Sequence, residues 1–162
     1  MAVLNIHQRA LPASLDEVGR LIDTLAGPTD LLWPHSTWPA MRFDRPLGTG
    51  AVGGHGPVRY FVSHYVPGRW IRFTFTGPRG FDGFHEYAVS AEHDHTMLGH
   101  TLAMSTHGPA RLTWPLIFRP LHDALIEDSF DRAEHAVTGI VARPAHWSGT
   151  VRRLRLRLAP PT

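Results

Sequence analysis

The stretch at residues 110–137, ARLTWPLIFRPLHDALIEDSFDRAEHAV, decides the fold because its apolar residues recur with the period of an α-helix. A step of about 100° per residue gathers them into one stripe, and Ser129 and Arg132 fall within it. The apolar members of the stripe are Trp114, Phe118, Leu121, Leu125 and Ala136. The pattern predicts a long helix whose inner face packs on the rest of the domain.

The opposite face of this predicted helix is charged, which indicates a solvated back. It carries Arg119, Asp123, Glu127, Asp131 and Glu134. Pro115 falls in the first turn, where a missing N–H is tolerated, whereas Pro120 should bend or break the helix. Such a bend fits a helix that arches over a cavity and equally one that adjusts to a curved sheet.

The N-terminal region reads as a strand at 3–11 followed by a helix that begins after Ser14. Glu17, three residues on, completes a capping box, and the apolar stripe of this helix continues to Leu25. The next residues, 29–56, are rich in Pro, Gly and Trp and predict little beyond a brief strand at 41–43.

A glycine pattern at residues 48–53, GTGAVG, matches the spacing of a dinucleotide-binding loop. That type of site needs a helix directly after the glycines, so that the helix N-terminus faces the pyrophosphate. Here more glycine and then a strand follow. The better interpretation is a mobile glycine-rich connection.

Four further strands are predicted at 58–66, 69–76, 83–91 and 97–106. Short, turn-forming segments join them, so consecutive strands should pair as hairpins. The expected fold class is therefore α+β, with an antiparallel meander that ends in the long helix.

The period-two phase of each strand predicts which side chains face that helix. The inward sets are Val58, Tyr60, Val62 and Val66, then Ile71, Phe73 and Phe75, then Tyr87 and Val89, and finally Leu98, Leu102 and Met104. The same phases bring His64, His85 and His100 inward, and His122 lies at the edge of the helix's inner stripe.

Composition limits the class of protein. The 162 residues suffice for one domain, expected at 1–140, with a tail at 141–162. There is no cysteine, and no apolar run approaches the length of a membrane span or a signal peptide. A cytoplasmic protein without stable membrane insertion is expected.

The basic residues are all arginine, and the tail holds five of them without an acid, which leaves the first 140 residues net acidic. A general nucleic-acid-binding surface is not expected. The alternating Leu and Arg at 153–158 allow three interpretations: an edge strand that pairs with another copy as a homodimer, a segment lying on an anionic surface, or a disordered tail.

Three segments carry a resemblance to a known family: 3–25, FTFTGPRGFDG at 73–83 and WPLIFRPLHDAL at 114–125. Over about residues 2–140 the chain resembles the START-related helix-grip superfamily (SRPBCC-like), in its polyketide cyclase/dehydrase branch. That superfamily includes lipid carriers, hormone receptors, aromatic cyclases and oxygenase domains, and it has no universal catalytic motif. The resemblance implies a curved antiparallel sheet wrapped around the C-terminal helix.

The resemblance also implies a pocket between sheet and helix that binds a hydrophobic small molecule, aromatic or polyketide-like. The candidate ligand-binding residues are Tyr60, Val62, His64, Phe73, Phe75, Leu102, Trp114, Phe118, Leu121, His122, Leu125 and Arg132. Alternatively, these residues fill a solid core, and the protein acts as an interaction module through its Arg/Leu tail.

The inward histidines leave an enzyme hypothesis open, in which His85, His100 and Tyr87 are the candidate catalytic residues. An imidazole titrates near neutral pH and a phenol can polarise a carbonyl, which suits a cyclase or dehydratase using general acid/base chemistry. Hydrogen-bonded wall histidines are the simpler alternative. No metal site and no cofactor are expected, because the strands spread these side chains and no paired His spacing focuses them.

Overall fold

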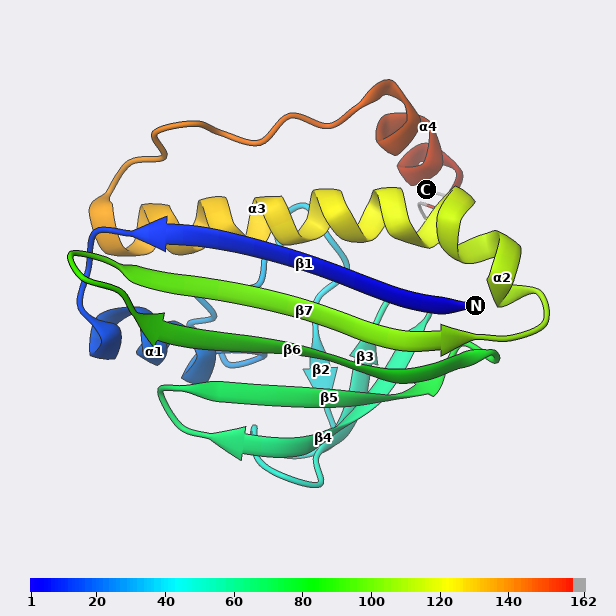
Figure 1. Cartoon of the computed structure of the whole chain (residues 1–162), viewed down its shortest axis with the longest axis horizontal. Helices are drawn as coiled ribbons and strands as arrows, with labels where there is room; N and C mark the ends of the chain where they lie inside the picture. The colour runs from blue at the N-terminus through cyan, green and yellow to red at the C-terminus, as the bar shows by residue number, and fades with distance from the viewer. Residues whose placement is uncertain (159–162) are drawn as a thin grey trace.

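The computed structural model describes residues 1–158 and contains one seven-stranded antiparallel sheet in the order β1-β7-β6-β5-β4-β3-β2 (Figure 1). The strands are β1 (Ala2–Leu11), β2 (Arg42–Phe43), β3 (Val52–His55), β4 (Val58–Val66), β5 (Trp70–Gly77), β6 (Phe81–Ala91) and β7 (Thr96–Thr106). The predicted meander β4 to β7 is confirmed, and the first strand joins it by pairing with the last.

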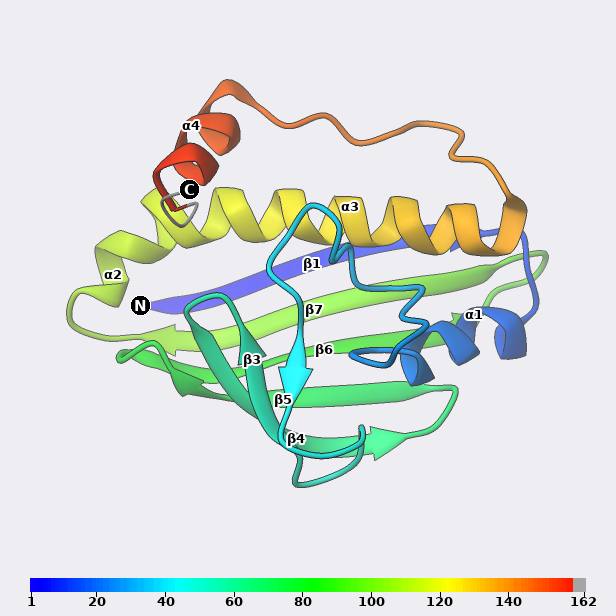
Figure 2. The ribbon, with the colours of Figure 1, turned by 180° about the vertical axis from the view of Figure 1, so that it is seen from behind.

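The glycine-rich stretch was predicted to be a connection, and this is wrong. It contains β3, which pairs with β2 and β4. Its glycines allow the strands to approach closely. A Cβ added to Gly53 would lie 1.9 Å from the carbonyl oxygen of Arg42, and one on Gly54 would lie 2.0 Å from that of Val58. Figure 2 shows β2 and β3 crossing the end of the curved sheet. These two strands bring His55 to the inner side of the sheet.

The N-terminal helix α1 (Leu15–Asp23) begins with the predicted capping box. Ser14 Oγ accepts from the Glu17 N–H, and Glu17 Oε2 accepts from the Ser14 N–H at 2.9 Å. The helix ends at Asp23, two residues before the end of its predicted apolar stripe, and packs on the sheet beside the β4–β5 turn.

The long helical segment is continuous over 29 residues but has three parts: α2 (Ala110–Thr113), a π-helical turn η1 (Trp114–Phe118) and α3 (Arg119–Thr138). The irregularity directly precedes Pro120, the second residue of α3, which has no N–H to bond to the carbonyl four residues back. Figures 1 and 2 show α2 and η1 turning away from the axis of α3.

The inner face of α3 differs in part from the predicted stripe. Leu125 and Ser129 are buried as expected, but Ile126, Phe130 and Ala133 are buried as well. Ala136 is exposed, so its assignment to the stripe is wrong. Ala136 has nearly the same angular position as Leu125, eleven residues earlier, but near the end of α3 Ala133 and Val137 pack with the core cluster instead.

The predicted solvated back is only partly exposed at four of its five residues, because β1 lies along it. The odd-numbered residues of β1 face α3, and three of them are polar: Asn5, His7 and Arg9. They bind the acidic row of α3, which consists of Asp123, Glu127, Asp131 and Glu134. These seven residues are called the seam below. Arg119 remains exposed.

The predicted strand phases are confirmed except at the end of β4. A register shift between Val62 and His64 marks a β-bulge at Ser63, and the residues beyond it change sides. His64 and Val66 are therefore exposed rather than inward. On the outer face, the His64 ring stacks on Trp70 at a centroid distance of 5.4 Å.

The tail forms a helix, α4 (Gly149–Leu158), so neither disorder nor an edge strand describes residues 149–158. Helix α4 returns toward the start of α3 after an extended run above it (Figure 1). Val151 is buried against the domain, and the Arg155 guanidinium lies between Trp38 and Trp147, 4.3 and 4.0 Å from their ring centroids. Residues 159–162 of the tail lie outside the described residues.

Among residues 1–158, none of the helices combines the length and the apolar character that crossing a bilayer requires.

Candidate functional site

Four histidines lie in a chain of rings that crosses the inner face of the sheet and ends on α3. His55, His85, His100 and His122 come from β3, β6, β7 and α3 and are called the histidine row below. Tyr60 connects the first two, with centroids 5.8 Å from His55 and 4.8 Å from His85. The remaining steps, His85 to His100 and His100 to His122, are 5.5 and 5.0 Å.

The pairing of β6 with β7 explains the closest contact in this row. Tyr87 is the register partner of His100, so His85 lies diagonally across from His100 on the same inner face. His85 Nδ1 lies 3.3 Å from His100 Nε2, within hydrogen-bond distance when one nitrogen carries the proton. Both side chains are almost completely buried. The sequence placed both histidines on the inner face but did not predict that they meet; the structure brings them into contact.

Several polar atoms of the row have no hydrogen-bond partner within the part of the chain that the structure describes. They are Tyr60 Oη, His85 Nε2, His100 Nδ1 and both ring nitrogens of His122. Tyr87 differs, because its hydroxyl lies 3.0 Å from Ser129 Oγ, which in turn donates to the Leu32 carbonyl at 2.9 Å. Buried polar groups in proteins are rarely left unpaired, so a cluster of them indicates a place for a polar partner.

Burial sets the protonation of these side chains. It lowers the pKa of His85 and of His100 well below the ordinary value, and it lowers the pKa of His55 to about 3. Burial also raises the pKa of Tyr60 and of Tyr87 above that of a free phenol. The interior at neutral pH therefore offers uncharged imidazoles and protonated phenols, which can hydrogen-bond a neutral polar group or transfer a proton.

Most of the predicted ligand-binding residues do lie between the sheet and the long helix. Tyr60, Val62, Phe73 and Leu125 belong to one apolar cluster, while Leu102 and Trp114 belong to a second one. Phe75 and Phe118 pack against both clusters, and Leu121 packs against the first. Phe73 and Phe75 stack on His85 at 4.8 and 5.2 Å. The structure thus surrounds the histidine row with aromatic carbon.

Two predicted ligand-binding residues are elsewhere. His64 faces outward because of the bulge at Ser63. Arg132 lies on the flank of α3, where its Nε donates to the Asp30 carbonyl at 3.2 Å and its terminal nitrogen donates to the same oxygen. Arg132 therefore pairs with a backbone carbonyl rather than with an acid.

One residue of the row, His55, was not predicted, because its surroundings, GGHG, read as a loop. Ser129 was expected on the inner stripe, but its pairing with Tyr87 depends on a contact across 42 positions of sequence. Phe81 was also missed; it joins Trp114 and Phe118 at centroid distances of 5.9 and 5.0 Å. It sits at a strand end, two residues before the predicted start.

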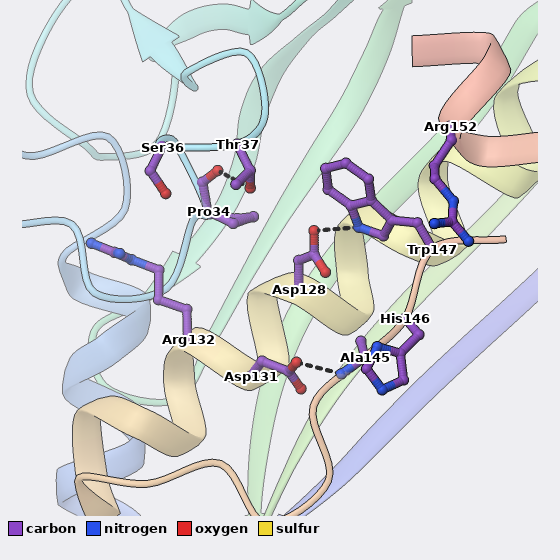
Figure 3. Close-up of a pocket in the computed structure, with 10 residues that line it drawn as sticks. All are labelled: Pro34, Ser36, Thr37, Asp128, Asp131, Arg132, Ala145, His146, Trp147 and Arg152. Atoms are coloured by element: carbon purple, nitrogen blue, oxygen red, sulfur yellow. Dashed lines mark hydrogen bonds between the residues drawn. The ribbon is translucent and has the colours of Figure 1, made fainter. Parts of the chain in front are cut away.

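A separate pocket of about 560 Å³ lies on the outside of the domain (Figure 3). Residues 34–37, α3 and residues 145–152 line it, and Arg132 is the single predicted ligand-binding residue among them. Asp128 Oδ2 accepts from the indole N–H groups of Trp38 and Trp147 at 2.7 and 2.8 Å, and Asp131 accepts from the Ala145 N–H at 2.7 Å. These bonds attach the C-terminal segment to α3, and the pocket lining combines charged side chains with apolar ones.

Comparison with models of protein families and with curated proteins gives no match. Solved structures do match. CalU16 from Micromonospora echinospora has a TM-score of 0.61 at 18% identity, over 97% of this chain and 84% of that one. Ara h 8.0201 has a TM-score of 0.62 at 13% identity, over 86% of this chain and 99% of that one.

A third match is a point mutant of norcoclaurine synthase from Thalictrum flavum, solved in complex with a transition-state analogue. Its TM-score is 0.60 at 15% identity, over 83% of this chain and 96% of that one. At these identities the likeness is one of fold. The architecture implied by the resemblance is confirmed, and the chain has the helix-grip fold, a curved antiparallel sheet closed by a long C-terminal helix.

Proposed function

We propose that this domain binds a small, largely hydrophobic molecule, aromatic or polyketide-like, between the sheet and α3, and that a polar group on this molecule meets the histidine row. The observation that carries the proposal is the set of unpartnered polar atoms on Tyr60, His85, His100 and His122 inside an aromatic interior. A ligand with one or two carbonyl or hydroxyl groups on a flat apolar skeleton matches both parts of that surface.

The energetics favour such a ligand over an apolar one. A buried donor or acceptor without a partner costs about 1–3 kcal/mol, so a ligand that satisfies Tyr60 Oη or His85 Nε2 regains part of that cost on binding. The rings of Phe73 and Phe75 stack on His85 and offer faces for an aromatic ligand.

Binding requires side chains of the interior to separate, because the rings of the row are in contact with one another. The π-helical turn η1 supports movement at one end of the long helix. Turns of this type are irregular and recur at functional sites, and Leu112 and Leu116 on this end are exposed. The complex of norcoclaurine synthase supports small-molecule binding within a protein of the same fold.

The test begins with native mass spectrometry of the purified protein and a thermal-shift screen of aromatic and polyketide-like compounds. For a hit, Tyr60→Phe and His85→Gln should each weaken binding by about tenfold, which equals about 1.4 kcal/mol. His64→Gln, on the outer face, is the matched control and should leave affinity unchanged. Unchanged affinity in all three variants, or loss of binding in Ser36→Trp at the outer pocket, contradicts an interior site.

A second candidate function is catalysis by the same interior, and the contact of 3.3 Å between His85 and His100 favours it. Two neutral imidazoles at that distance can pass a proton, and Tyr87 can donate to a carbonyl oxygen. A cyclase or dehydratase of this kind converts the bound compound without a cofactor. Turnover should then be lost in His100→Gln while binding persists; a ligand recovered unchanged from the wild-type protein contradicts this candidate.

A further inference from the structure

Two residues of the seam, His7 and Asp123, lie beside His122, the last member of the histidine row. His7 on β1 and His122 and Asp123 on α3 offer one ligand atom each, and these three atoms lie within 4.8 Å of one another. His7 Nε2 lies 3.3 Å from Asp123 Oδ1, and His122 Nδ1 lies 3.6 Å from the same oxygen. The second distance is too long for a hydrogen bond.

These distances match the spacing of ligands around a tetrahedral metal ion. With metal–ligand distances of about 2.0–2.1 Å for imidazole and carboxylate, adjacent ligand atoms are about 3.3–3.4 Å apart. The two separations to Asp123 Oδ1, 3.3 and 3.6 Å, lie near this value, and all three atoms lie within 4.8 Å of one another. Two imidazoles and one carboxylate are also the ligand types that zinc and other first-row transition metals bind, whereas magnesium and calcium prefer oxygen.

An ion pair between His7 and the acids explains only part of the group. Among the described residues, neither ring nitrogen of His122 has a hydrogen-bond partner, although both are buried. The ring stands at the end of the histidine row, next to the seam. A metal ion bound to His122 Nδ1 would be the partner that no side chain of the seam provides for this nitrogen.

The surrounding residues hold two of the three ligands in the required orientation. Glu127 Oε1 lies 2.7 Å from His7 Nδ1, which leaves Nε2 of the same ring directed at Asp123. The Asn5 side chain donates to Asp123 Oδ1 at 2.9 Å. Histidine ligands of metals usually donate their second N–H to a carboxylate in this way, and that contact fixes the ring.

The group is also accessible. The side chains of His7 and His122 are 14% and 15% exposed, and that of Asp123 is 36% exposed, so an ion can reach the site from solvent between β1 and α3. With three protein ligands, a fourth position stays open for water or another small ligand. Binding at His7 Nε2 displaces the proton that this nitrogen otherwise donates to Asp123.

We propose that His7 Nε2, His122 Nδ1 and Asp123 Oδ1 bind one divalent transition-metal ion, with zinc as the test ion, in a three-ligand site at the seam. This site shares His122 with the proposed interior site but needs no interior ligand, and variants of His7 and Asp123 test it without changing the histidine row. Sequence spacing did not indicate it, because His7 and Asp123 are 116 positions apart and only the packing of β1 on α3 brings them together.

The test uses the full chain treated with a chelator and then titrated with Zn²⁺ against a competing chelator, with the bound metal counted by native mass spectrometry. One ion per chain is expected. His7→Gln and Asp123→Asn should each weaken affinity by about 100-fold or more, and Glu127→Gln by about 10–100-fold. Circular dichroism checks that each variant is folded.

The chain has twelve histidines, so weak surface binding needs a control. The double variant His93→Gln/His95→Gln removes a solvated pair in the β6–β7 turn and should leave the tight site intact. Tight binding that persists in both His7→Gln and Asp123→Asn, or is lost in the double variant, overturns the proposal. Anomalous scattering from a zinc-soaked crystal provides a measurement independent of mutation: a peak bonded to these three residues supports the site, and its absence there overturns it.

Discussion

Along the seam, every charged side chain has at least one charged or backbone partner. Arg9 alone binds Glu127, Asp131 and Glu134, at 3.1, 3.1 and 2.6 Å. Along the histidine row, on the neighbouring side of the same helix, the groups are uncharged and several are unpaired. The difference indicates two roles. The seam holds α3 against the edge strand β1, and the histidine row has free hydrogen-bonding groups for a ligand.

The largest expected effect comes from breaking the seam at its centre. Arg9→Met keeps the apolar stem but leaves three partly buried carboxylates without their shared cation. The free energy of unfolding should fall by about 2–3 kcal/mol, because an ion-pair network has lost one partner in a poorly solvated place. Urea denaturation measures this change.

The matched control is Arg45→Met, whose pair with Asp44 is exposed. It should change stability by less than about 1 kcal/mol. Equal losses in the two variants would mean that the seam is no stronger than an ordinary surface ion pair.

A smaller effect is expected from acid acting on the row. His85 is buried and neutral because burial lowers its pKa well below the ordinary value, and its neighbours Tyr60 and His100 are uncharged as well. The unfolded chain binds a proton at His85 below about pH 6.5 and the folded protein does not, so stability is full above that pH and falls as the pH is lowered.

His85→Gln removes this group, and with it the proton that only the unfolded chain binds there. Between pH 6.5 and pH 5, the free energy of unfolding should fall less steeply with decreasing pH in the variant than in the wild type. The difference in slope should be about 1 kcal/mol per pH unit. Chemical denaturation at a series of pH values gives the slopes. Parallel pH profiles for the variant and the wild type would show that His85 binds its proton over the same pH range in the folded protein as in the unfolded chain.

The smallest effects compare the two buried tyrosines. Tyr87→Phe loses the contact with Ser129 and leaves that hydroxyl with fewer partners, so stability should fall by about 1 kcal/mol. Tyr60→Phe removes a hydroxyl that has no partner among the described residues and should be neutral or slightly stabilising in the ligand-free protein. Thermal melts of both variants are sufficient, and a large loss in Tyr60→Phe would mean that its hydroxyl is paired after all.

Sequence patterns predicted the elements whose signals are local. The capping box of Ser14 and Glu17 formed as expected, and the strands 58–66 and 97–106 have nearly the predicted bounds. The alternation of β6 and β7 placed His85 and His100 on one inner face, which the register confirms. Each of these follows from turn residues or from a period that a short window contains.

The features that were wrong depend on contacts between distant segments. The bulge at Ser63 turned His64 outward, and no residue type at that position announces a bulge. β3 forms because its glycines leave room for the backbones of the strands on both sides. Sequence patterns do not show which strands these are. The seam had a readable signal, the polar alternation of Asn5, His7 and Arg9, but only the pairing of β1 with β7 shows that this face meets α3.

The π-helical turn η1 has a consequence for chain length. In this turn, the Arg119 N–H donates to the carbonyl of Trp114, five residues back. The turn therefore holds one residue more than a turn of α-helix does. Deletion of exposed Leu116 would therefore restore a regular helix without shortening α3. Because the turn accommodates this extra residue locally, the deletion would change the packing next to Trp114, whose ring lies 5.8 Å from that of His122. The wall at this end of the interior thus depends on a single inserted residue rather than on the identity of a side chain.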